Sequence, residues 1–174
     1  YTLPAGAMSI NAEVEVLTDN LDPFDVKTLV LKVENTSETI SESDKISIAL
    51  QSVCDFDYDG FIGTYDAVKG GNSYIVTVEE GPEVNTLKLT NADNEGGTTI
   101  IELATDVLNP TIIYRSEEFD AALYDHSSYG SIWATTVTPE SSSYNSCDYS
   151  MQLEFKRCVS IGCFGGTRQI SLTK

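Results

Sequence analysis

The sequence predicts an all-β protein, with a partial β-sandwich over residues 1–53 followed by an antiparallel meander or small β-barrel over residues 54–174. Short runs in which apolar and polar residues alternate recur along the chain, which is the period of a strand with one buried face. Glycine, proline and asparagine turn signals separate these runs. The four cysteines and single histidine fit disulfides in an oxidising compartment better than a zinc site.

The chain of 174 residues carries a formal net charge of −17. This excess of carboxylates argues against nucleic acid and anionic membrane surfaces as partners, because like charges repel. It suits a highly soluble surface or a protein that binds divalent cations. No apolar run approaches the length of a membrane span, so we expect no transmembrane segment. The sequence opens within a pattern at residues 1–4, which predicts a processed chain or part of a longer one.

Three strands are expected in the first part of the chain, at residues 8–16, 29–33 and 46–50. The first alternates apolar residues with serine, asparagine and glutamate, so its acidic side should face solvent. Turn-rich or polar segments follow the first strand at residues 18–25 and the second at residues 35–44. Three strands with one apolar face cannot complete a sandwich, so something else must cover that face.

These residues resemble the C-terminal part of a Calx-β-type repeat. The resemblance lies in LPAGA at residues 3–7, DNLD at 19–22, TLVL at 28–31 and ISIAL at 46–50. It covers residues 3–53 and implies an Ig-like sandwich. It also implies that the N-terminal strands of the sandwich lie outside this sequence or are supplied by a partner.

The densest group of carboxylates is the segment Cys54–Asp66, which has the D-x-D-x-D-G spacing of a calcium loop. Asp55, Asp57 and Asp59 occupy its first, third and fifth positions, and Ca²⁺ prefers such oxygen ligands. Asp66 stands at the twelfth position, but residues 61–65 begin a strand that would carry it roughly 20 Å away at ~3.3 Å per residue. The segment is therefore either a Ca²⁺ site formed by three aspartates or a solvated acidic turn.

About eight strands are expected in the second part of the chain, and residues 117–124 are the only segment that would suit a helical turn. The strands correspond to the runs beginning at residues 61, 74, 87, 98, 111, 130, 149 and 167. Short turns between them favour an up-and-down barrel or a curled antiparallel sheet.

Two further resemblances arise here. Gly63-Thr64-Tyr65 is similar to the opening of lipocalin and other calycin barrels. The CDY motif at residues 147–149, the segment at 155–163 and the final ISLT at 170–173 resemble the C-terminal β modules of secreted or lipid-anchored surface proteins from Bacteroidota. This second resemblance implies residence at the cell surface and a binding or structural role. It supplies no catalytic residues.

The strand pattern selects one of the three ways to pair four cysteines. Cys147 and Cys158 bracket a strand of roughly 30 Å at ~3.3 Å per residue, so they cannot bond to each other. Cys158 and Cys163 lie in one hairpin loop. The first and seventh strands of a meander start at the same end, which brings Cys54 to Cys147. We therefore predict the disulfides Cys54–Cys147 and Cys158–Cys163.

Candidate functional residues are few. Asp125, His126 and Ser127 are neighbours in sequence, which seldom gives catalytic-triad geometry, and no G-x-S-x-G motif accompanies them. Tyr124, Tyr129 and Trp133 fall in one region, where exposed rings would stack on sugars. Alternatively, such aromatic side chains fill the core of the barrel.

The sequence thus predicts a non-catalytic module at the extracellular or outer-membrane surface that binds glycans or other surface proteins within a larger assembly. One alternative is a structural subunit of a filament or adhesin, in which a neighbouring chain donates the strand missing from the N-terminal sandwich, in a homo- or hetero-assembly. Another is a calycin-like carrier of a small apolar ligand. We expect Ca²⁺ as the one cofactor, if the acidic segment binds it.

Overall fold

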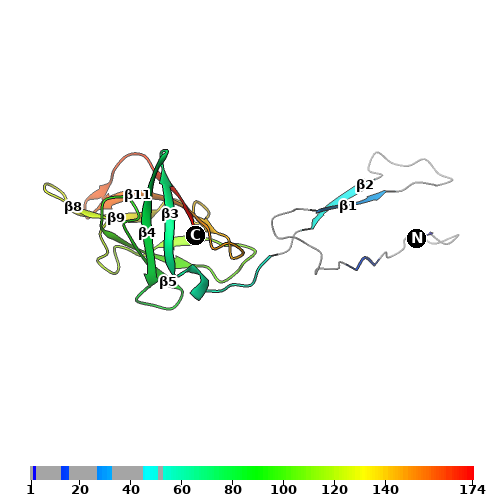
Figure 1. The fold of residues 1–174 in the computed structure, drawn as a ribbon. Helices are drawn as coiled ribbons and strands as arrows, with labels where there is room; N and C mark the ends of the chain where they lie inside the picture. Colours follow the sequence, from blue (N-terminus) through cyan, green and yellow to red (C-terminus); the bar gives the residue numbers. More distant parts are fainter. Residues whose placement is uncertain (1, 3–12, 16–26, 33–44, 51–52) are drawn as a thin grey trace. The chain divides into compact units, whose positions relative to one another are not determined.

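The computed structural model describes residue 2 and residues 13–15, 27–32, 45–50 and 53–174 (Figure 1). The chain divides into two compact units, Tyr1–Ser52 and Val53–Lys174. This division falls one residue before the predicted boundary. The architecture is all-β, as predicted, and the one helical element among the described residues is the 3₁₀ turn Asp59–Phe61. No helix in those parts of the chain has the length and hydropathy needed to span a membrane.

The first unit contains a two-stranded antiparallel sheet, formed by β1 (Lys27–Lys32) and β2 (Lys45–Leu50). Both strands are predicted from the sequence. Leu29 pairs with Ile48 and Leu31 with Ile46, so these four side chains share one face. Leu31, Ile46 and Ile48 are exposed. The described residues therefore include an apolar sheet face that they do not themselves cover.

Several predictions for the first unit lie outside the described residues. They are the LPAGA motif, the turn at residues 18–25, the loop at 35–44 and most of the strand at 8–16. Of that strand the structure describes Glu13, Val14 and Glu15, which are exposed and have no strand conformation. Val14, which the alternation predicts to face a core, is 48% exposed.

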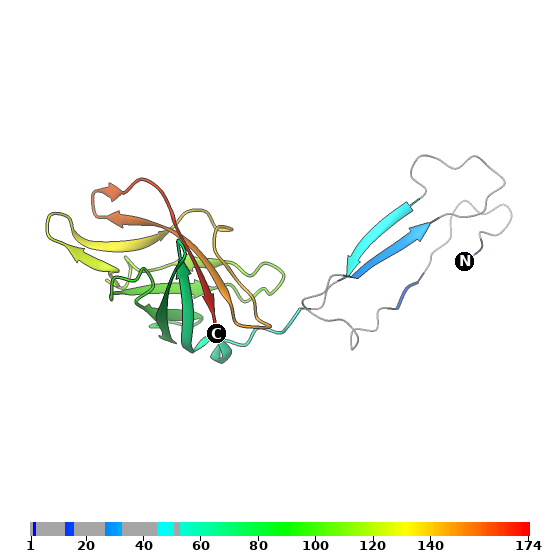
Figure 2. The same ribbon diagram turned by 45° about the horizontal axis from the view of Figure 1, so that its top comes forward.

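The second unit is a single curled antiparallel sheet (Figures 1 and 2). Its long strands follow the predicted runs, and three short strands, β8, β10 and β12, add to them. In order the strands are β3 (Gly63–Lys69), β4 (Asn72–Glu80), β5 (Thr86–Thr90), β6 (Thr98–Leu103), β7 (Ile112–Tyr114), β8 (Tyr124–His126), β9 (Gly130–Thr136), β10 (Ser143–Tyr144), β11 (Met151–Val159), β12 (Gly162–Cys163) and β13 (Arg168–Thr173).

The ring of strand pairings in this unit closes through one narrow contact. Strand order runs β7-β6-β5-β4-β3-β13-β11, so the first and last strands of the unit are neighbours. β10 pairs with β11 at its start, and an isolated bridge joins Thr111, just before β7, to Ser143 of β10. Backbone N–H groups of Ile112 and Tyr144 donate across this junction at 3.0 Å. The sheet is therefore closed at one end of β7 and is joined by no ladder to β9 at the other.

A side chain replaces part of the backbone ladder next to this junction. The buried Ser142 Oγ donates to the Glu154 carbonyl at 3.0 Å and accepts the Glu154 N–H at 2.8 Å. β9 and β10 lie along the same edge of β11, and residues 137–142 bulge out between them. Ser142 satisfies the backbone of β11 where the bulge interrupts the pairing.

The inner face of the curled sheet is filled with apolar side chains that alternate along the strands. Phe61, Tyr65, Leu89, Ile101 and Phe155 are among those with no exposed surface. They belong to one cluster that includes residues of every long strand from β3 to β13. Because side chains occupy this space, the carrier alternative gains no support from the described part of the chain.

Three local predictions differ from the structure. The strand expected from residue 61 begins at Gly63, because Asp59–Phe61 form the 3₁₀ turn. The strand expected from Tyr149 begins at Met151, because Tyr149 has a left-handed backbone with φ of 58°. Residues 117–124 form no helix: Ser116–Asp120 are a turn, and Tyr124 already belongs to β8.

Candidate functional site

A cleft of about 320 Å³ opens where β7 and β9 separate. β9 uses one edge to pair with β11 and the other edge, at Gly130–Ile132, to pair with β8. Beyond Ile132 that second edge faces β7 without a ladder, and the Tyr114 N–H donates instead to Thr136 Oγ1 at 2.9 Å. The walls of the cleft are Tyr114, Arg115, Glu117 and Glu118 on one side and Ala134 and Thr135 on the other.

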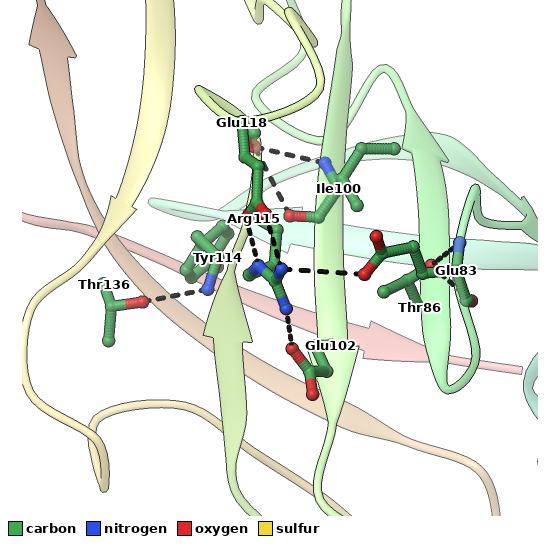
Figure 3. Close-up of polar contacts among 9 residues, drawn as sticks. Glu83, Thr86, Ile100, Glu102, Tyr114, Arg115, Glu118 and Thr136 are labelled. Carbon is green, nitrogen blue, oxygen red and sulfur yellow. Dashed lines mark hydrogen bonds and ion pairs between the residues drawn. The ribbon is translucent and has the colours of Figure 1, made fainter.

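One wall of the cleft is held by the guanidinium of Arg115 (Figure 3). Its Nη2 donates to Glu118 Oε1 at 2.8 Å and its Nε to Glu118 Oε2, while its Nη1 donates to Glu102. Glu83 lies 3.6 Å from Nη2. The hydrogen bonds that Arg115 donates to Glu118, and then the one to Glu102, raise the pKa of Arg115, and Arg115 lowers the pKa of Glu118. The cluster ties β6 and the turn before β5 to the segment that follows β7.

A buried serine sets the position of this segment. Ser116 is 1% exposed, and its Oγ lies 2.5 Å from Thr99 Oγ1 and accepts the Ile100 N–H at 3.1 Å. The Arg115 N–H donates to the Ile100 carbonyl at 2.9 Å. These bonds to β6 fix the backbone of residues 115–116. The side chains of Arg115 and Glu117 therefore extend from a fixed backbone at the rim of the cleft.

The stability that the ion pair between Arg115 and Glu118 contributes should depend on pH. Because the folded pKa of Glu118 is lowered from its ordinary value of 4.5, the pair stabilises the fold above that value and its contribution is lost as the pH falls through the folded pKa. We expect the melting temperature of the wild type to exceed that of Glu118→Gln at pH 7, by a small margin because the pair is largely exposed. Thermal melts from pH 7 to pH 2.5 should show the margin closing on the acid side. A margin that stays constant, or widens, in acid contradicts the pair.

The three aromatic residues predicted to bind a ligand lie on neighbouring strands but not on one face. Tyr124 of β8 pairs with Ile132 of β9, so these two share a face that is continuous with the core. Trp133 is the next residue along β9 and therefore lies on the opposite face. Its Nε1 is buried without a hydrogen-bond partner among the described residues. Tyr129 lies in the turn between β8 and β9 and is 50% exposed.

Tyr129 belongs to a different group of rings from the one predicted. Its centroid lies 4.9 Å from that of His126 and 5.6 Å from that of Phe164, which meets it edge to face. Phe164 follows β12, and its N–H donates to the Arg157 carbonyl of β11. We call residues 124–136 together with residues 156–164 the arm; Figure 2 shows its two hairpins, β8–β9 in yellow and β11–β12 in orange, extending side by side from the sheet.

The polar residues around His126 are engaged in the turn between β8 and β9. His126 Nδ1 accepts the backbone N–H of Ser128 at 3.1 Å, and Asp125 Oδ1 accepts the hydroxyl of Ser131 at 2.7 Å. These are local bonds of a hairpin. The sequence Asp125–His126–Ser127 is therefore used to shape the turn and forms no relay from carboxylate to imidazole to hydroxyl.

The acidic segment before β3 keeps its three aspartates exposed, and the intervening Phe56 and Tyr58 pack against the core. Asp57 accepts a hydrogen bond from the Tyr149 hydroxyl at 2.9 Å. No group of three metal-binding side chains gathers in the described parts of the chain, this segment included. Asp66 lies in β3 opposite Ile75 of β4, away from the segment, as the strand pattern predicts. A Ca²⁺ site at Asp55, Asp57 and Asp59 remains a prediction.

Both disulfides have the pairing predicted from the strand pattern, Cys54–Cys147 and Cys158–Cys163. Cys147 lies just before β11, and Cys54 precedes β3, the first strand of the unit. Cys158 and Cys163 face each other on β11 and β12, with 3.9 Å between their Cα atoms. The second disulfide therefore links β11 to β12 within the arm, at the residue of β11 that also pairs with Trp133 of β9.

The sequence reasoning did not identify the cleft or the Arg115 cluster. Glu118 stands three residues after Arg115, a spacing that can suggest an ion pair, but Glu83 and Glu102 are distant in sequence. No family model matches this chain, and neither the curated proteins nor the solved structures include a match to it.

Proposed function

We propose that this chain is a non-catalytic extracellular module that binds glycans in the cleft between β7 and β9. The observation that carries the proposal is the cleft itself: it has a volume of about 320 Å³ and opens through a gap in the sheet. Small-ligand sites typically have volumes of ~300–1,000 Å³ and combine a few fixed polar groups with apolar surface.

The polar groups at the cleft suit hydroxyl-rich ligands. A guanidinium and carboxylates are planar groups with several donors or acceptors, so they can bond to neighbouring hydroxyls of one sugar. Arg115 is already held by Glu102 and Glu118, which lowers the entropy that it would lose on binding. Glu117 is exposed at the rim and its side chain has no hydrogen bond or ion pair within residues 53–174, so its carboxylate is free to accept bonds from a ligand.

An extracellular location is supported by the use of all four cysteines in disulfides. Such bonds persist in oxidising compartments and are rare in the cytosol. Residence at a cell surface, membership of a larger assembly and anchoring as a lipoprotein rest on the resemblance to Bacteroidota surface modules. The absence of catalysis is also proposed; the engagement of His126 and Asp125 in a turn supports it.

Glu117→Gln is expected to weaken binding of a neutral glycan about tenfold, because a hydrogen bond to a charged acceptor contributes ~1.5–3 kcal/mol. The matched control is Glu140→Gln, another exposed glutamate, which lies outside the cleft. A library of neutral oligosaccharides would be screened by microarray, and hits titrated by calorimetry. Thr135→Arg, which places a large side chain in the cleft, should abolish binding while the melting temperature stays near that of the wild type.

Binding that survives Thr135→Arg would place the glycan elsewhere and overturn the assignment to the cleft. A screen without a hit would count against the glycan-binding function as a whole.

A structural subunit completed by strand donation is the second candidate, and the exposed apolar face of the β1–β2 sheet favours it. An added strand or sheet from a neighbouring chain would bury Leu31, Ile46 and Ile48. The double variant Leu31→Ser/Ile48→Ser should then convert an assembled species into a monomer in size-exclusion chromatography with light scattering. A wild type that is monomeric at all concentrations would remove this candidate.

A further inference from the structure

Positive charge is scarce in the second unit, and three of its seven cations form ion pairs. By sequence, residues 53–174 contain seven lysines and arginines against eighteen aspartates and glutamates, a balance of 7 − 18 = −11. Lys69 pairs with Asp93, Lys88 with Glu79, and Arg115 with its glutamates. Lys174 donates to the Gly60 and Ile62 carbonyls. With so many carboxylates present, an arginine without one is unexpected.

The remaining three cations, Lys156, Arg157 and Arg168, belong to the neighbouring strands β11 and β13 and form no ion pair within the fully described residues 53–174. Arg168 of β13 is directly opposite Phe155 of β11, and Arg157 is two residues further along β11. Arg157 and Arg168 thus lie on one sheet face, diagonally across the end of the β11–β13 ladder, where such residues are about 7–8 Å apart. Lys156 lies on the other face.

The face that carries the two arginines is free of acids. Its other members, read from the register of β8, β9, β11 and β13, include Tyr124, Ile132, Ala134, Thr136, Phe155 and Ile170. Glu154, the nearest acid along β11, lies on the opposite face with Lys156. Two like charges held on a surface without counter-ions repel each other, so an anion that bridges them would stabilise both.

Arg157 is positioned beside the cleft rather than extended at random into solvent. Its Nη1 donates to the Tyr124 hydroxyl at 3.1 Å. β11 and β8 flank β9 on opposite edges, so this bond crosses the face of β9 that carries Ala134. Ala134 pairs with Arg157 and also lines the cleft. Arg157 does not itself line the cleft, but a ligand that extends from Ala134 across this face would reach its guanidinium.

We propose that Arg157 and Arg168 form a subsite for the carboxylate or sulfate group of an acidic glycan, so that the module selects acidic over neutral sugars. This inference rests on the proposed glycan-binding function and names its ligand class. An arginine donates two parallel hydrogen bonds to a carboxylate or sulfate, and the neighbouring Tyr124 ring offers a surface for the sugar face. An acidic sugar carries a ring next to its anionic group, and that ring can pack on the Tyr124 ring beside Arg157. The acidic side chain of a peptide has no such ring, so an acidic peptide fits this arrangement less well.

The test compares dextran, oligogalacturonate and dextran sulfate by affinity electrophoresis and calorimetry. Oligogalacturonate and dextran sulfate separate the carboxylate from the sulfate source. We expect at least one to bind at least tenfold more tightly than dextran. Arg157→Gln and Arg168→Gln should each remove about tenfold of that affinity, and neither should change binding of dextran. Lys88→Gln removes the same charge from an exposed position and should change acidic binding less than twofold.

Tyr124→Phe separates the guanidinium from its positioning bond: it should weaken acidic binding by a few fold and leave the arginines charged. Far-UV circular dichroism of each variant checks that the sheet is intact. Equal affinity for dextran and both acidic glycans would overturn the subsite and leave the glycan-binding function standing. No binding of any glycan would overturn both. If Lys88→Gln lost as much affinity for the acidic glycans as Arg157→Gln, the effect would come from overall charge and the proposal would be overturned. Binding of poly-glutamate as tight as that of the acidic glycans would overturn it in the same way.

Discussion

Replacing both Cys54 and Cys147 with serine should lower the free energy of unfolding by about 4.5 kcal/mol. The two residues are 93 positions apart, so the disulfide closes a long loop and removes much of the conformational entropy of the unfolded chain. For a unit of this size such a loss corresponds to a fall in melting temperature of roughly 15 °C. Chemical denaturation followed by circular dichroism would measure the change directly.

The second disulfide supplies the control. Cys158 and Cys163 are separated by five positions, and the same relation between loop length and entropy gives about 2 kcal/mol for their replacement by serine. The double variant at Cys54 and Cys147 must therefore be clearly less stable than the double variant at Cys158 and Cys163. Equal losses, or the reverse order, would show that the long disulfide does not link elements that separate on unfolding.

Phe61→Ala is expected to destabilise the second unit by about 4 kcal/mol, the usual range for a fully buried phenylalanine being ~3–5 kcal/mol. Phe61 has no exposed surface, and its ring centroid lies 5.1 Å from that of Tyr144 and 5.3 Å from that of Tyr149, both edge to face. Truncation would remove these ring contacts and leave a cavity beneath the 3₁₀ turn. Equilibrium unfolding in urea measures the loss.

Two controls identify the cause of that loss. Phe61→Leu keeps most of the apolar volume and should cost about 1 kcal/mol. Val84→Ala changes a side chain that is 85% exposed and should stay within about 0.5 kcal/mol of the wild type. If Phe61→Ala cost no more than Phe61→Leu, the ring cluster would not be part of the cooperative core.

The acidic segment before β3 shows what a residue pattern can and cannot predict. The alternation of Asp55, Asp57 and Asp59 with Phe56 and Tyr58 appears in the structure as exposed carboxylates and packed rings. The spacing that suggests a Ca²⁺ loop reflects the same alternation. The sequence could not show that Tyr149 packs on Gly60, where an added Cβ would lie 2.0 Å from the ring, or that its hydroxyl reaches Asp57.

The candidate site was accessible to sequence reasoning only in part. The region of Tyr124 and Tyr129 was recognised from its aromatic content, but alternation along β9 places Trp133 on the opposite face from Tyr124. The Arg115 cluster and the cleft were missed, since their members come from separate strands. Likewise Arg157 and Arg168 are eleven residues apart in sequence and become neighbours only through the register of β11 and β13.

The sequence by itself determined the all-β class, the positions of the long strands and the pairing of the cysteines. The class and the strands follow from alternation along each strand, which is a local property. The pairing of the cysteines follows from strand length together with the up-and-down order of a meander. The tertiary structure alone decided that the first and last strands of the unit pair, that Thr111 and Ser143 close the sheet, and that β7 separates from β9. Those features depend on which strand edges meet, and a strand's own sequence specifies its faces far more strongly than the partner at its edge.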